Sequence, residues 1–163
     1  MRKRIFKITL IVVSLVLLAA GVILITSGDP VLIVTAPREI STGGAFNVDI
    51  SIKHNPGIAV FVIDLKYDET IFEFVSVENG NLFTSELAIR DRDFDDYYAT
   101  RAMFAELDPF RGDGVLYKVY FNVRHDTSPG EYDFELLYSP GNIVETPGKE
   151  VNPDTINTKV TVS

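Results

Sequence analysis

The stretch formed by residues 58–68 constrains the fold of this chain more than any other part of the sequence. In a β-strand, residues two apart share a face. The odd-numbered residues of this stretch form one apolar row: Ala59, Phe61, Ile63, Leu65 and Tyr67. The even-numbered row starts with Ile58, Val60 and Val62 and becomes polar at Asp64 and Lys66. Because one face of a sandwich strand is normally in water, we expect Val60 and Val62 to need a covering loop or a binding partner.

Other runs with strand character follow one another at short spacing. They occupy residues 31–35, 45–53, 71–77, 97–105, 114–123, 131–138 and 157–162, with a weaker one at 86–90. Turns rich in Gly, Pro and Asn separate them, and no sustained helical period occurs beyond residue 28. Eight or nine such strands predict an all-β, two-sheet antiparallel sandwich of jelly-roll or immunoglobulin-like kind.

The N-terminal region predicts a membrane segment. Residues 8–25 carry no charge and follow four basic residues. As a helix this segment spans ~27 Å, close to the thickness of a bilayer's hydrocarbon core. We expect residues 1–28 to form a single-pass signal anchor with a cytoplasmic N-terminus, and residues 29–163 to form one extracellular domain. The alternative is a secreted domain, released by cleavage of a signal peptide near Ala19-Ala20-Gly21.

The charge of the exported part narrows the range of partners. All 23 Asp and Glu residues follow Gly28, whereas four of the 15 Lys and Arg residues precede Ile8, so the exported part carries a formal charge of −12. Such a surface repels nucleic acid and anionic lipid. Cysteine is absent, which excludes disulfides and thiol chemistry.

No catalytic or metal-binding motif is apparent. His54 and His125 are far apart and lie beside predicted turns, and no nucleophile elbow or zinc-protease motif accompanies them. The cluster at residues 91–96 has aspartates like the first ligands of a calcium loop, but Asp96 replaces the loop's glycine and Ala102 its final glutamate. We expect a solvated loop there, no enzyme, and no metal or cofactor bound by the chain itself.

Several segments, taken in order, carry a family resemblance. The first runs through Pro56-Gly57-Ile58-Ala59 to Leu65-Lys66-Tyr67-Asp68 and on to Phe72-Glu73-Phe74-Val75-Ser76-Val77. The others are Met103-Phe104-Ala105-Glu106, Asp113-Gly114-Val115-Leu116 with Tyr120-Phe121-Asn122-Val123, and Thr127-Ser128-Pro129-Gly130-Glu131-Tyr132. Together these segments, over residues 31–162, resemble the strands of cohesin domains.

This resemblance implies a nine-stranded jelly roll that binds dockerin modules through one sheet face. Dockerins are small helical modules that carry calcium, so calcium would belong to the partner. The family's contact positions correspond to Val60, Val62, Phe94, Met103, Glu106, Ile143 and Glu145 of this chain. Asp64, Glu106 and Glu145 would form a polar rim that pairs with basic residues of the partner.

The predicted binding face departs from the best-known cohesins. Val60 and Val62 stand where type I members carry an asparagine and an aspartate. The apolar set formed by Val60, Val62, Phe94, Met103 and Ile143 is more similar to the hydrophobic face of type II cohesins. The competing interpretation is structural: the predicted loop at residues 91–96 would simply cover the two valines.

The resulting functional hypothesis is a membrane-anchored extracellular module that displays dockerin-bearing proteins, with any contact to polysaccharide being indirect. One alternative is a carbohydrate-binding module, although Tyr97, Tyr98, Tyr117 and Tyr120 do not form an obvious aromatic strip in the sequence. Another is a structural or adhesive ectodomain that packs against a membrane partner.

Overall fold

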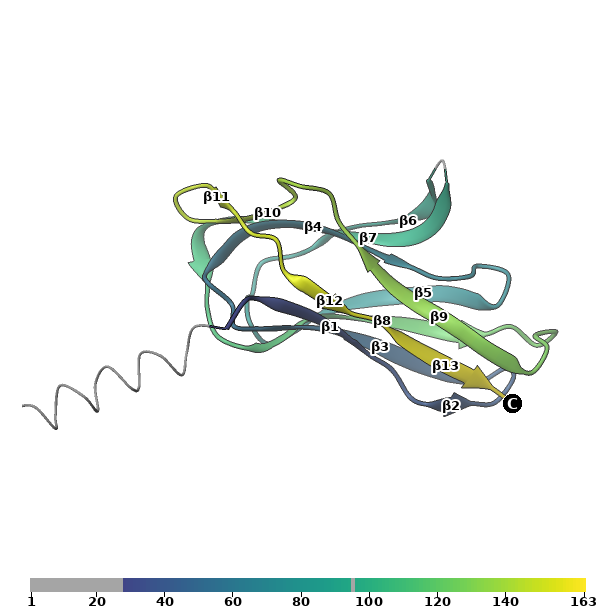
Figure 1. Cartoon of the computed structure of the whole chain (residues 1–163). Coiled ribbons are helices and arrows are strands. Elements are labelled where there is room, and N and C mark those ends of the chain that lie inside the picture. Colours follow the sequence, from purple (N-terminus) through teal and green to yellow (C-terminus); the bar gives the residue numbers. More distant parts are fainter. Residues whose placement is uncertain (1–27, 95) are drawn as a thin grey trace, which may run out of the picture.

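The computed structural model describes residues 28–94 and 96–163 (Figure 1). The predicted anchor at residues 8–25 lies outside these ranges. Within them, no helix is long and apolar enough to cross a membrane.

The described chain folds into β-strands only. They are β1 (Val31–Thr35), β2 (Glu39–Ile40), β3 (Ala45–Lys53), β4 (Ile58–Lys66), β5 (Phe72–Asn79), β6 (Ala88–Phe94), β7 (Tyr97–Phe110), β8 (Gly114–Val123), β9 (Gly130–Leu137), β10 (Ile143–Glu145), β11 (Lys149–Glu150), β12 (Asp154–Ile156) and β13 (Thr158–Val162). The prediction of an all-β sandwich is therefore confirmed for the described residues.

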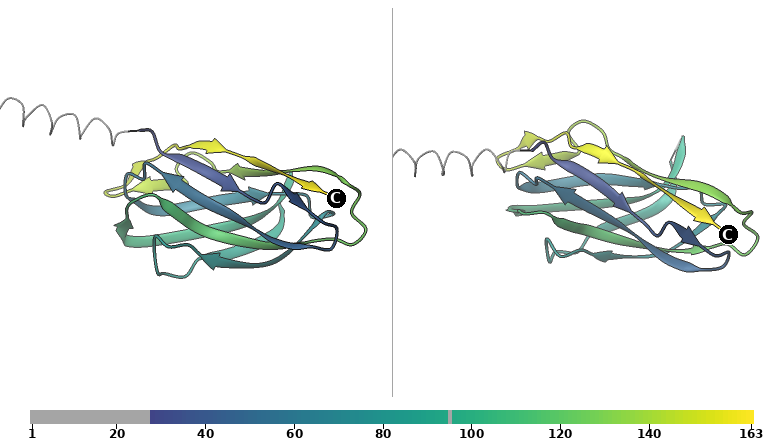
Figure 2. Two further views of the ribbon diagram at one scale, coloured as in Figure 1. Left: turned by 90° about the horizontal axis from the view of Figure 1, so that it is seen from below. Right: turned by 60° about the horizontal axis from the view of Figure 1, so that its bottom comes forward.

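The strands form two packed sheets (Figures 1 and 2). The five-stranded sheet has the order β12-β1-β3-β8-β5. In the other sheet β4 is central: β7 and then β6 lie on one side of it, while β10 and β9 share its other edge. Strands β13 and β2 extend this sheet beyond β9, and β11 pairs with β10, so that the sheet has eight strands.

The two ends of the chain cross between the sheets together. β1 and β12 pair in parallel in the five-stranded sheet, and β2 and β13 pair in parallel in the other. Figure 1 shows the yellow C-terminal strands running beside the dark N-terminal ones. Because each segment switches sheets at the same side of the sandwich, that side is closed by hydrogen-bonded backbone.

Strand β3 shows how the sequence pattern produces the core. Its even-numbered residues Phe46, Val48, Ile50 and Ile52 are buried, while the alternating polar residues are half-buried or exposed. This period of two matches the pleat of a strand with one wet face. Strand β8 pairs with β3 and likewise contributes Leu116, Val119, Phe121 and Val123 to the core.

Aromatic rings fill the space between the sheets. Phe61 stacks on Phe104 with ring centroids 5.3 Å apart, and Tyr67 meets Phe121 edge to face at 4.7 Å. Such pairs add to the hydrophobic stabilisation that burial alone provides. Because the chain has no cysteine, no disulfide supports the core, and its stability depends on this packing.

Two differences from the predicted strands affect the candidate site. Strand β7 continues through Phe110, and residues 91–94 belong to β6 rather than to a solvated loop. The short strands β2, β10, β11 and β12 were not predicted, because each has only two or three residues. Their extended shape comes from pairing with longer neighbours, which a local apolar pattern does not reveal.

Candidate functional site

Val60 and Val62 lie on the outer face of the eight-stranded sheet, together with other apolar side chains. Strand register places Val60 between Ala105 of β7 and Val144 of β10. The next row places Val62 beside Met103, which in turn pairs with Ala88 of β6. Directly paired residues in a sheet point to the same face. We call these six residues the apolar patch: Val60, Val62, Ala88, Met103, Ala105 and Val144.

The residues of the apolar patch are partly exposed to solvent, whereas the residues that alternate with them on β4 are not. Val60, Val62, Met103 and Val144 are half-buried, and Ala88 and Ala105 are exposed. The alternate residues of β4, Phe61 and Ile63, are completely or almost completely buried. The predicted division of this strand into a core row and an outer row is therefore confirmed at these positions.

A bulge explains why Ile58 does not belong to the patch. The register between β4 and β7 shifts between Ile58 and Val60, so Ile58 is paired with Phe110. Ile58 and Phe110 are 1% and 6% exposed, respectively. The additional residue of a bulge turns the strand and changes the face to which neighbouring side chains point. Ile58 thus joins the core.

An ion pair borders the apolar patch. The Asp64 carboxylate, only 4% exposed, accepts hydrogen bonds from the Arg101 Nε and Nη2 atoms, both at 2.6 Å. The Tyr97 hydroxyl donates a third bond to Asp64 at 2.6 Å. The hydrogen bond to Asp64 raises the pKa of both Tyr97 and Arg101. The carboxylate is thus neutralised within its own sheet.

Aromatic rings cover this ion pair at the β6–β7 turn. Phe94 stacks on Tyr97 with centroids 5.3 Å apart. The guanidinium carbon of Arg101 lies 4.3 Å from the centroid of the Phe94 ring, and that of Arg92 lies 4.8 Å from it. These are cation–π distances. Phe94 is therefore on the predicted face, held by two arginines at the far side of Asp64 from the patch.

The structure changes the predicted contribution of β10. Ile143 is 0% exposed and is paired with Phe61, so its side chain lies in the core. It is therefore not a surface contact, and the prediction for this residue is wrong. Its neighbour Val144 pairs with Val60 and lies on the outer face instead. A shift of one residue in a strand exchanges the two faces.

The predicted acidic rim is also altered. Asp64 is occupied by Arg101, so it is no free carboxylate for a partner. Glu145 is bound by Lys149 at 2.9 Å. Glu106 is half-buried and lies on β7 immediately after Ala105. Of the three acidic residues predicted for the rim, two are already paired with basic side chains of the chain itself.

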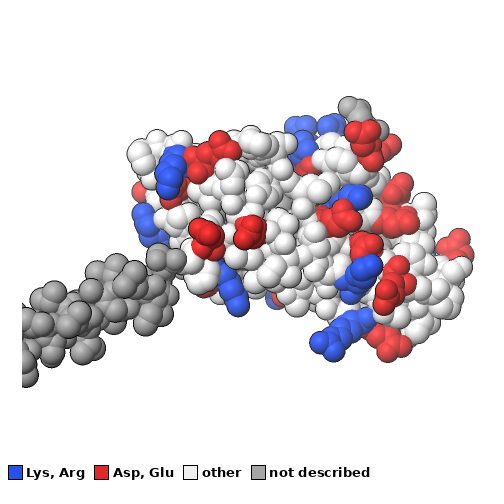
Figure 3. All heavy atoms as spheres, viewed as in Figure 1, with Lys and Arg blue, Asp and Glu red and all other residues white. Residues whose placement is uncertain are grey.

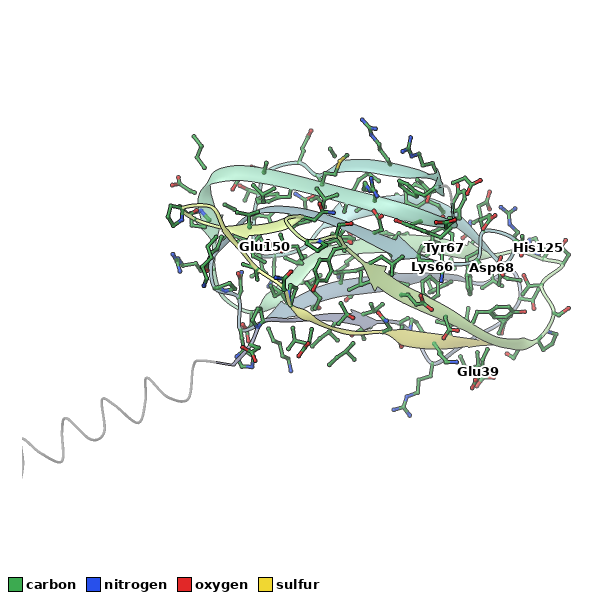
Figure 4. The ribbon with its side chains drawn as sticks, turned by 45° about the horizontal axis from the view of Figure 1, so that its top comes forward. Glu39, Lys66, Tyr67, Asp68, His125 and Glu150 are labelled. Atoms are coloured by element: carbon green, nitrogen blue, oxygen red, sulfur yellow. The ribbon has the colours of Figure 1, made fainter. Side chains whose placement is uncertain are left out.

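Asp91 of β6 holds strands together instead of covering the two valines. Asp91 accepts hydrogen bonds from the hydroxyls of Tyr67 at 2.7 Å, Tyr98 at 2.9 Å and Thr100 at 2.7 Å. Tyr67 lies at the end of β4, beside Lys66 and Asp68 (Figure 4). Burial, and then the bond to Asp91, raise the pKa of Tyr67. Because β6 extends the sheet beside β7, residues 91–94 do not form the predicted loop over Val60 and Val62.

The histidines do not converge on one site. His54 follows β3 and lies against Gly28, whereas His125 lies against Gly43, before the start of β3. His125 is at one end of the sandwich and Glu150 is at the other (Figure 4). Among the residues with described positions, no group of three or more His, Asp or Glu side chains is placed to hold a metal ion.

The four tyrosines considered for sugar stacking do not share a face. Tyr117 is completely buried, and Tyr120 lies on β8 of the five-stranded sheet, where its hydroxyl donates to Glu78 at 2.5 Å. Tyr97 lies on the outer face of the opposite sheet with Asp64. Tyr98 points to the other side of β7, toward Asp91. These residues therefore form no aromatic strip.

Comparison with known proteins agrees with this architecture. The family model described as "Cohesin domain" matches residues 30–162. No curated protein matches the chain.

Several solved structures share the fold. A cohesin in a type I cohesin–dockerin complex from Clostridium thermocellum has a TM-score of 0.71 and 18% identity, with 83% of this chain and 100% of that chain covered. The sixth cohesin of scaffoldin B from Acetivibrio cellulolyticus, in complex with a dockerin, has the same TM-score and coverage at 16% identity. A non-cellulosomal cohesin from the archaeon Archaeoglobus fulgidus has a TM-score of 0.66 and 20% identity, with 83% and 92% covered.

These structures show the fold, and the match of the family model covers nearly all of the described chain. The resemblance found in the sequence is thereby confirmed. The chain belongs to the cohesin family, with its cohesin domain at residues 30–162.

Proposed function

We propose that this chain is a non-catalytic docking module that binds a calcium-loaded dockerin through the outer face of its eight-stranded sheet. The observation that carries the proposal is the apolar patch. Its six side chains come from four adjacent strands and keep partial exposure, while the residues that alternate with them on β4 are buried. Two of the solved cohesins with this fold are described as complexes with dockerins.

The patch suits recognition by burial of apolar surface. A standard protein interface buries ~800 Å² on each partner, an area that one sheet face can supply. Backbone pairing on both sides of β4 fixes the positions of Val60 and Val62 before the partner arrives. Little conformational entropy is then lost on binding, which favours affinity.

The proposed contacts follow the predicted face with two changes. Val60, Val62, Met103 and Val144 form the apolar centre. Phe94, on the far side of Asp64, and Glu106, which follows Ala105 on β7, are the proposed outer contacts. Val144 replaces Ile143, and the paired carboxylates of Asp64 and Glu145 are left out of the rim. Apolar residues at the two β4 positions also favour a recognition mode similar to that of type II cohesins rather than the polar one of type I.

Calcium is proposed to belong to the partner. A dockerin needs bound calcium to hold its helices, so removing calcium should abolish binding without changing this chain. The cohesin domain would contribute apolar surface and fixed charges only.

The proposed location is the cell surface. Residues 8–25 would span the membrane once, with the N-terminus in the cytoplasm, and the cohesin domain would extend outside. Dockerin-bearing proteins, such as polysaccharide-degrading enzymes or surface proteins, would then be held there. Contact with polysaccharide would be made by those proteins.

The test is titration of the full chain, in detergent, with calcium-loaded dockerins of the same organism. We expect saturable binding that a chelator abolishes, while the circular dichroism of the chain stays unchanged. Absence of binding to every dockerin, or binding that is indifferent to calcium, would contradict the proposal. Protease accessibility in intact cells tests the location: an extracellular domain is cleaved without breaking the cells.

A further inference from the structure

Strand β6 separates opposite charges onto two faces. Its sequence Arg90-Asp91-Arg92-Asp93 alternates basic and acidic residues. The side chain of Asp91 points to the hydroxyls of Tyr67, Tyr98 and Thr100. Since strand residues alternate between faces, Arg90 and Arg92 lie on the opposite side from Asp91. That side is the face of the apolar patch, because Arg90 pairs with Arg101 and Ala88 pairs with Met103.

Two arginines of this face lie directly opposite each other on neighbouring strands. Arg90 and Arg101 are cross-strand partners on β6 and β7. Like charges in this position destabilise a sheet unless another charge compensates them. Asp64 compensates Arg101. The ion pairs among the described residues use Asp64, Asp133, Glu135 and Glu145, and none of them includes Arg90 or Arg92.

These two arginines, which form no ion pair with any described residue, are exposed and placed for contact. Arg90 and Arg92 are both exposed, and the guanidinium of Arg92 is held over the Phe94 ring together with that of Arg101. Residues two apart on a strand are separated by ~7 Å, so Ala88, Arg90 and Arg92 form one continuous line leading out of the apolar patch. Figure 3 shows basic atoms gathered next to the tip of the β6–β7 hairpin.

The chemistry of a guanidinium determines what these residues would bind. Arginine presents a planar set of donors that matches a carboxylate, and its positive charge is permanent. On a domain that is acidic as a whole, this basic strip differs from its surroundings. A partner with carboxylates in line with its apolar contact residues would be attracted to the strip and repelled elsewhere.

We propose that Arg90 and Arg92 bind carboxylates of the partner, so that the dockerin recognised by this face carries Asp or Glu side chains beside its apolar contact residues. This inference rests on the proposed function and reverses the polarity of the rim expected from the sequence. The partner's acidic side chains would pair with β6 while its apolar side chains cover Val62 and Met103.

The experiment is a charge reversal in the full chain. The double variant Arg90→Glu/Arg92→Glu is titrated with the dockerin that binds the wild-type protein, at low and at high ionic strength. We expect binding to weaken at least about tenfold at low ionic strength, and much less at high ionic strength, because salt screens exposed charges. Reversal of the partner's acidic residues to Lys should restore part of the loss.

The matched control is Arg38→Glu/Lys53→Glu. It makes the same change in net charge at two other exposed positions: Arg38 lies just before β2, and Lys53 is the last residue of β3. Normal binding by this control and weakened binding by the β6 variant would support the inference.

Equal binding by the β6 variant and the wild type would overturn the inference. If Val62→Asp still abolishes binding in that case, the proposed function stands and only the acidic partner is rejected. If no dockerin binds the wild-type chain, the proposed function fails, and the inference fails with it.

Discussion

Asp64 and Arg101 form a two-bond ion pair across β4 and β7, with both N–O distances at 2.6 Å. This pair lies on β4 and β7, in the sheet that carries the apolar patch. The Asp64 carboxylate is buried, and Arg101 neutralises its charge and fixes its position. Tyr97 adds a third bond, and Phe94 covers the guanidinium.

Removal of the arginine should destabilise the domain strongly. Arg101→Met leaves the Asp64 carboxylate buried with only the Tyr97 bond, and loss of one member of a buried pair costs about 3 kcal/mol. Urea unfolding monitored by circular dichroism measures this loss. The control is Lys66→Met, which breaks the half-exposed pair between Lys66 and Glu135 and should cost less than about 1 kcal/mol. Equal costs for the two variants would contradict the importance given to burial.

Two adjacent residues of β10 should respond oppositely to the same substitution. Ile143→Asp places a carboxylate in the core, where Ile143 is 0% exposed, and should prevent folding or reduce the melting temperature sharply. Val144→Asp changes only the outer face and should leave the melting temperature nearly unchanged while weakening dockerin binding at least about tenfold. Thermal unfolding and titration of both variants check this. An Ile143→Asp protein with the melting temperature of the wild type would show that β10 has been assigned to the wrong register.

The hydroxyl of Tyr117 offers a route to higher stability. It is buried and has no hydrogen-bond partner among the described residues, although the ring itself stacks on Phe61. A buried polar group without a partner costs about 1–3 kcal/mol. Tyr117→Phe keeps the ring and should therefore leave the free energy of unfolding unchanged or increase it by about 1 kcal/mol. A clear decrease in urea denaturation would contradict this expectation.

Alkaline pH should unfold the domain through its tyrosines. Burial raises the pKa of Tyr67, and a hydrogen bond to Asp91 raises it further. In the unfolded chain tyrosine loses its proton near pH 10, while folded Tyr67 retains it. The stability contributed by Tyr67 is therefore complete below about pH 10 and declines as pH rises above that value.

The measurement is absorbance of tyrosinate during a pH titration, combined with circular dichroism. We expect part of the tyrosine signal to appear only when the β-sheet signal is lost. Tyr67→Phe should remove part of this coupled signal. Ionisation of all tyrosines in a folded domain would contradict the burial of Tyr67.

The alternating pattern determined which side chains form the core. Phe46, Val48, Ile50 and Ile52 point inward because a strand has a period of two, and this rule needs only local sequence. The same rule identified Val60 and Val62 as apolar residues on an outer face. The cohesin resemblance succeeded for a related reason, since its motifs are the core rows and turns of successive strands.

Register and pairing were decided only by the tertiary structure. Ile143 and Val144 are both apolar, so composition does not indicate which of them faces Phe61. The Arg90–Arg101 and Asp64–Arg101 relationships join strands that are distant in sequence. In the linear sequence, the run at residues 90–93 alternates basic and acidic side chains and has no net charge. Once it pairs as a strand, its two charges lie on opposite faces, because the pleat directs successive side chains apart.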